Sequence, residues 1–169
     1  MRKILSTIAL VCVATFALSA CDQSEKPKQE AVELAPVVLP MPANATDKNA
    51  WKAYLVSVVT ANMQGVKSNH PYMYFVPGGD DDVSKADRNN QLENVRGIVG
   101  RGVLPGNMLA FGGPNSSITS QLVVDAFKDV QPGSFKDVVV LFVGTKADAE
   151  AVKQQLASSQ AIIRIVEAK

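Results

Sequence analysis

The chain has 169 residues, of which 17 are basic and 16 acidic, so its formal net charge is only +1 at pH 7. A nucleic-acid-binding protein would carry a clustered excess of lysine and arginine, and this sequence shows no such patch. About 120 residues follow the N-terminal region, which is enough for one domain with a real core. No internal repeat indicates a solenoid or a propeller.

Residues 1–20 have the three-part layout of a secretory signal peptide. Arg2 and Lys3 give a positive start, residues 4–17 form an apolar run, and small residues follow. This run is shorter than the roughly 20 apolar residues that span a bilayer, and hydroxyl side chains interrupt it. It is followed by Leu18-Ser19-Ala20-Cys21, which places a cysteine where cleavage is expected.

Leu18-Ser19-Ala20-Cys21 resembles the lipobox of bacterial lipoproteins, and the resemblance covers about residues 1–22. It implies that Cys21 receives a diacylglycerol thioether, becomes the new N-terminus and is usually N-acylated. Two or three acyl chains would anchor the mature chain stably, whereas a single chain binds only marginally. The alternatives are an uncleaved interfacial helix and a plain secreted protein.

Asp22 directly follows the cysteine. In lipoproteins of enteric bacteria, which this segment resembles, aspartate at that position is an inner-membrane retention signal, and Gln23 is compatible with it. The resemblance therefore predicts a lipid anchor at the periplasmic face of the inner membrane, with the outer membrane as the alternative. Cleavage would leave 15 basic against 16 acidic residues and, because Cys12 is removed and Cys21 lipidated, no cysteine for a disulfide.

Residues 21–46 combine the lipidated cysteine with a proline-containing stretch that lacks an apolar period, which predicts a flexible tether. The apolar patch Val37-Val38-Leu39 favours a solvated kink between prolines, and docking on the domain or on a partner is the alternative. The sequence therefore divides into a signal peptide at 1–20, a tether at 21–46 and a single α/β domain at 47–169.

The domain is expected to begin with an amphipathic helix that Thr46 or Asp47 caps. Its apolar residues recur at three- and four-residue spacing, and they are Trp51, Tyr54, Leu55, Val58, Val59, Met63 and Val66. Trp51 belongs to this stripe, so we expect it in the core and not in a binding site.

Strands and helices then alternate along the chain. We expect strands at 72–76, 107–111, 138–143 and 161–166, and the nearly all-apolar run at 138–143 is typical of a parallel strand buried on both faces. Capping boxes at Ser84-Lys85-Ala86-Asp87 and at Thr145 with Asp148 predict two helix starts. The alternation predicts an α/β fold, a small Rossmann-like domain with about four mainly parallel strands and about four helices.

In such sheets ligands bind beyond the carboxyl ends of the strands. The best candidate is an anion-binding loop, because glycines allow close approach and a helix N-terminus presents free N–H groups. Turns and helix caps have the same composition, so a structural role is the alternative. The loop residues are Gly112, Gly113, Asn115, Ser116 and Ser117.

Other candidate sites are weaker. Asp80-Asp81-Asp82 has carboxylates suited to a hard cation, but consecutive aspartates favour a solvated turn. Arg88, Arg96 and Arg101 could grip an anion together, although arginines near helix ends more often complement the helix dipole.

The sequence offers few residues that could form a catalytic site or bind a metal ion. His70 is the only histidine and precedes the first expected strand, so it should lie at the opposite end of a parallel sheet from Ser116 and Ser117. This placement argues against a serine hydrolase triad. One histidine without a free cysteine also falls short of the usual zinc ligands. We therefore predict no catalytic residues, no metal and no cofactor.

These observations favour a non-enzymatic envelope lipoprotein whose α/β domain binds a protein partner. Its role would be that of an accessory factor of an envelope complex or of an immunity-type inhibitor of a toxic effector. The alternative is a domain that binds or converts a small molecule or phosphate ligand with the loops after its strands. The fold alone favours none of these, because many unrelated functions share it.

Overall fold

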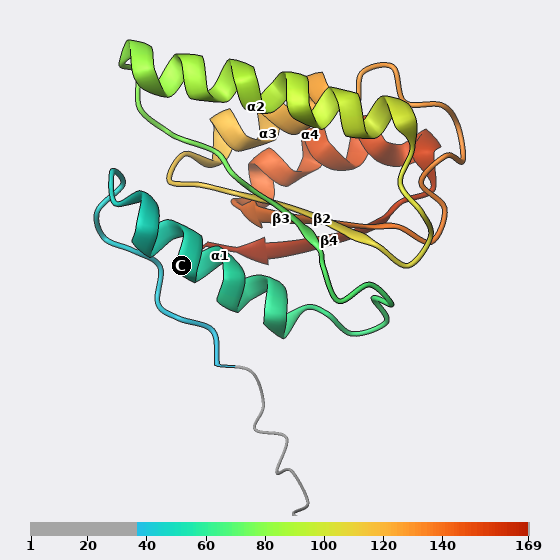
Figure 1. Cartoon of the computed structure of the whole chain (residues 1–169), viewed down its shortest axis with the longest axis horizontal. Coiled ribbons are helices and arrows are strands. Elements are labelled where there is room, and N and C mark those ends of the chain that lie inside the picture. Colours follow the sequence, from blue (N-terminus) through green and yellow to red (C-terminus); the bar gives the residue numbers. More distant parts are fainter. Residues whose placement is uncertain (1–36, 169) are drawn as a thin grey trace, which may run out of the picture. The chain divides into compact units, whose positions relative to one another are not determined.

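The structure is a computed structural model that describes residues 37–168. The lipobox, Cys21 and Asp22 lie outside this range. Helices and strands alternate along the described chain (Figure 1), in the order α1 (Lys48–Ala61), β1 (Tyr72–Phe75), α2 (Asp82–Arg101), β2 (Met108–Gly112), α3 (Ser116–Ala126), β3 (Val139–Gly144), α4 (Lys146–Leu156), a short 3₁₀ helix (Ala157–Ser159) and β4 (Ile162–Glu167). This order confirms the predicted α/β class.

The four strands form one parallel sheet in the order β1-β2-β3-β4. Every crossover therefore steps in the same direction. As a result α2, α3 and α4 cover one face of the sheet, and α1 lies on the other (Figure 1). The domain is Rossmann-like in its alternation, but its strand order never reverses, and such a reversal is what opens the ligand crevice of doubly wound sheets.

Two apolar clusters form the core, one on each face of the sheet. Leu109, Phe111 and Phe142 belong to the cluster under α2, α3 and α4, whereas Met108 and Leu141 belong to the cluster under α1. Every residue of β2 and β3 is buried, as the apolar run at 138–143 predicted for its strand. Trp51 is 3% exposed, which confirms its place in the core.

The helix caps show which local signals decide each start. Asp47 caps α1 and Thr145 caps α4, as predicted. The prediction that Ser84 caps α2 is wrong, because the Asp81 carboxylate accepts the Ser84 backbone N–H at 2.9 Å and the helix begins at Asp82. Asp81 and Ser84 can each fit a capping pattern with the residue three positions on, and the earlier residue caps the helix here.

Tyr74 is a core residue with an unsatisfied polar atom. Its side chain is 6% exposed and stacks on Phe111 at 5.0 Å between ring centroids. Within residues 37–168 its buried hydroxyl has no hydrogen-bond partner. Burial, with a smaller contribution from nearby Tyr72, raises the pKa of Tyr74 to about 12.

Tyr74→Phe should leave stability at neutral pH unchanged or raise it by up to ~1 kcal/mol, because it removes an unpaired buried hydroxyl. The native pKa lies above the value of about 10 for an unfolded chain, so the tyrosine's contribution is intact below pH 10 and is lost as the pH rises through about 12. Urea unfolding at neutral pH and near pH 11 should therefore show a larger alkaline loss for wild type than for the variant. Identical losses would contradict this.

Candidate functional site

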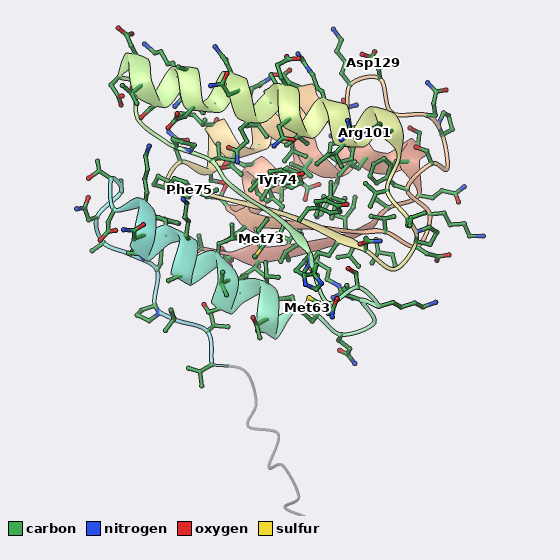
Figure 2. All side chains as sticks on the ribbon, viewed as in Figure 1. Met63, Met73, Tyr74, Phe75, Arg101 and Asp129 are labelled. Carbon is green, nitrogen blue, oxygen red and sulfur yellow. The ribbon has the colours of Figure 1, made fainter. Side chains whose placement is uncertain are left out.

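A groove of about 570 Å³ runs along the outer side of β1 between α1 and α2, and we call it the β1 groove. Its α1 wall consists of Lys48, Lys52, Leu55 and Val56. Met73, Phe75 and Pro77 form the floor, and Asp87, Asn90, Gln91 and Asn94 form the α2 wall. Figure 2 shows Met73 on the α1 side of the strand and Tyr74 on the α2 side.

The groove exists because β1 is an edge strand and a single helix covers that face of the sheet. At the opposite edge, Arg164 on β4 donates to the backbone oxygens of Asn62 and Gln64 and so ties β4 to the C-terminal end of α1. At the β1 edge the interaction that the described residues show is instead the Lys48–Asp87 pair between α1 and α2, and Met73 on β1 remains 42% exposed. The β1 side of α1 is therefore the open side.

The backbone of β1 presents free polar groups to this groove. The Val76 N–H donates to the Gly112 oxygen at 2.9 Å, so Val76 faces β2. Successive residues of a strand direct their N–H and C=O groups to opposite sides. The N–H and C=O groups of Met73 and Phe75 therefore point away from β2, and no loop or side chain among residues 37–168 bonds to them.

The α2 wall is lined by unpaired carboxamides. Asn90, Gln91 and Asn94 are close enough in sequence to share one helix face, and they have no hydrogen-bond partner within residues 37–168. The Gln91 Oε1 atom is also shielded from solvent. A buried acceptor without a donor costs free energy. The Asn90 and Asn94 amides, which are exposed, are thus available to a ligand that offers both donors and acceptors.

The α1 wall combines cations with apolar surface. Lys48 pairs with Asp87 at 2.8 Å, and because α1 and α2 lie on opposite faces of the sheet, this pair passes around the edge of β1. Both side chains are about half exposed, so the pair adds little stability, on the order of 1 kcal/mol or less. Lys52 has no partner in the described part of the chain. Val56, next along the wall, is 47% exposed.

In the structure, residues of the predicted anion-binding loop contact other residues of the domain. A Cβ on Gly113 would lie 2.0 Å from the Val76 oxygen, and Gly112 packs beside Leu55 and Val143. The Asn115 side chain accepts the Ile118 N–H at 3.1 Å and caps α3.

The serines of this loop differ in their surroundings. The Ser116 hydroxyl accepts the Thr145 N–H at 2.8 Å, which links β3 to α3, while Ser117 is exposed. The contacts of the loop thus favour its structural role, and anion binding there stays a prediction.

The remaining charged candidates make local contacts within the domain. Asp81 caps α2, and hydrogen bonds from Ser84 lower its pKa. Arg88 donates to the Pro77 and Gly79 oxygens, and Arg96 bonds to Glu93 and to the Asp125 oxygen. Within residues 37–168 no group of three histidine, cysteine, aspartate or glutamate side chains is placed to hold a metal ion.

His70 lies just before β1, whereas Ser116 and Ser117 follow β2. Because the two strands are parallel, the histidine and the serines lie at opposite ends of the sheet, as the sequence predicted. No histidine, serine or cysteine lines the β1 groove either. The described lining of the groove therefore holds no serine–histidine or cysteine–histidine pair of the kind that activates a hydroxyl or thiol nucleophile.

Sequence reasoning missed the β1 groove. The signals were present, namely apolar Met73 beside Tyr72 in an expected strand and carboxamides at 90, 91 and 94 on the next helix.

None of the described helices is long and apolar enough to cross a membrane. No protein-family model, curated protein or solved structure matches the chain.

Proposed function

We propose that the chain is a bacterial lipoprotein anchored through Cys21 at the periplasmic face of the inner membrane, and that its α/β domain binds a protein partner. The lipobox and Asp22 support the anchor. The β1 groove is the observation that carries partner binding, because it joins an open strand edge to apolar and amide side chains. An envelope accessory factor and an immunity-type inhibitor both fit this arrangement.

The shape and lining of the groove favour a protein over a small molecule. Small-molecule sites usually enclose most of their ligand and converge a few polar groups on it. Here Val56 and Met73 are 47% and 42% exposed, and the groove follows the length of a strand edge. Residues of the loops after β1, β2 and β3 contact one another, which favours a structural role for these loops.

The test compares full-length wild type with Cys21→Ala and Asp22→Ser by density-gradient fractionation of membranes, followed by crosslinking and purification in mild detergent. Wild type is expected in the inner-membrane fraction with one stoichiometric protein partner. Cys21→Ala should give a released or unprocessed protein, because it lacks the acyl chains that hold the mature chain on the membrane. Asp22→Ser should move the mature protein to the outer membrane.

Each part of the proposal has an outcome that contradicts it. A Cys21→Ala protein that is processed and anchored normally would exclude the lipoprotein assignment, and wild type in the outer membrane would exclude retention by Asp22. Absence of a partner, together with a rise in melting temperature with phosphate or nucleotides, would favour the small-molecule alternative.

A further inference from the structure

The walls of the β1 groove restrict what can pair with the free edge of β1. The strand edge lies between α1 and α2, and the Lys48–Asp87 pair passes around it. The β1 strand of a second copy would be walled in the same way, so two such edges cannot meet. A single extended segment from a partner can enter, because it brings no flanking helices.

The spacing along α1 matches that of an extended segment. Lys48, Lys52 and Val56 follow one another at four-residue intervals on the wall of the groove, which corresponds to steps of about 6 Å along a helix. Side chains on one face of a strand recur at about 6.6 Å. Neighbouring same-face residues of an added strand would thus lie opposite Val56 and Lys52.

The side chain preferred at each position of the added segment follows from the residues of the groove that it faces. A side chain opposite Val56 and Met73 meets exposed apolar surface. The next one on that face meets Lys52, whose ammonium has no partner among the described residues, whereas Lys48 already pairs with Asp87. Side chains on the other face of the segment meet the carboxamides of Asn90, Gln91 and Asn94.

We infer that the protein partner adds an extended segment to the edge of β1, with backbone hydrogen bonds to Met73 and Phe75, and that this segment carries an apolar and an acidic residue two positions apart. The backbone bonds supply affinity, and the side chains on alternate positions supply specificity. This inference rests on the proposed function, since it names the site and the recognition mode of the partner.

The test uses the full-length protein in detergent micelles and a synthetic peptide, Thr-Glu-Thr-Val-Thr-Glu-Thr, acetylated and amidated at its ends. Its sequence reads the same in both directions, so the peptide presents the same side chains whether it pairs parallel or antiparallel to β1. The matched peptide has lysine in place of both glutamates. Binding of fluorescent versions is followed by anisotropy, and exchange of the backbone amides is followed by NMR.

The acidic peptide is expected to bind at least five-fold more tightly than the lysine peptide and to slow amide exchange at Met73 and Phe75. Lys52→Glu should reverse the order of the two peptides, because it changes the sign of the charge that faces the acidic side chain. Val56→Asp should weaken the acidic peptide. Lys128→Glu, an exposed lysine on the segment after α3, serves as the matched control and should change neither affinity.

Equal affinities for the two peptides, slowed exchange elsewhere in the domain, or no binding at about millimolar peptide would overturn the inference. A wild-type dimer that Lys52→Glu converts to a monomer would identify a second copy as the occupant and would overturn it as well. If the native partner still co-purifies with Lys52→Glu and Val56→Asp, partner binding stands and this use of the groove fails. If wild type carries no partner, the proposed function itself fails.

Discussion

Gly113→Ala should destabilise the domain by about 3 kcal/mol or more, because the new methyl group has no room. Its Cβ would lie 2.0 Å from the Val76 oxygen and 3.0 Å from the Val76 carbonyl carbon. These are backbone atoms, so no side-chain rotation relieves the clash. Val76 is fully buried and its N–H donates to Gly112. Relief would therefore require separating the ends of β1 and β2.

Gly100→Ala provides the matched control, since it makes the same chemical change inside α2. Nothing lies within 4 Å of a Cβ at Gly100. Alanine in a helix interior is favoured over glycine by roughly 0.5–1 kcal/mol, and Gly100 lies in the last turn of α2, so this variant should be at least as stable as wild type. Urea unfolding of both variants measures the two effects. A Gly113→Ala protein as stable as wild type would show that β1 and β2 do not approach each other as described.

The parts of the fold that one segment determines by itself were predictable from the sequence. The apolar run at 138–143 places apolar side chains on both faces of its strand, which predicts burial on both faces, and β3 is buried throughout. Asp47 and Thr145 cap their helices because each precedes an apolar repeat at capping distance. Competition between Asp81 and Ser84 for the start of α2 was the exception, since both residues accept backbone N–H groups equally well.

The groove was not predictable because it depends on strand order. Alternating strands and helices specify parallel pairing, but they do not say which strand lies at an edge. The observed order β1-β2-β3-β4 leaves Met73 and Phe75 at an open edge with α1 and α2 on either side. The role of the predicted anion-binding loop was hard to predict for a chemical reason, because glycine, asparagine and serine also form helix caps and close backbone contacts. In the structure Gly113 approaches the Val76 backbone, Asn115 caps α3 and Ser116 accepts the Thr145 N–H.

Leu141→Ala is the second large effect that we expect, with a loss of ~2 to 5 kcal/mol in the free energy of unfolding. Leu141 is fully buried in β3, between Ala110 on β2 and Arg164 on β4. Its side chain belongs to the cluster under α1. Truncation leaves a cavity under that helix, and the strands on both sides limit how far the cavity can close.

Ile162→Ala is the control for this substitution, because Ile162 lies on the edge strand β4 and is 46% exposed. Its truncation removes fewer buried contacts and should cost less than ~1 kcal/mol. Because Leu141 packs in the cluster under α1, whereas α4 packs in the other cluster, Leu141→Ala should also speed amide exchange in α1 more than in α4. A loss below about 1 kcal/mol for Leu141→Ala, or faster exchange in α4 alone, would show that this side chain does not hold α1 against the sheet.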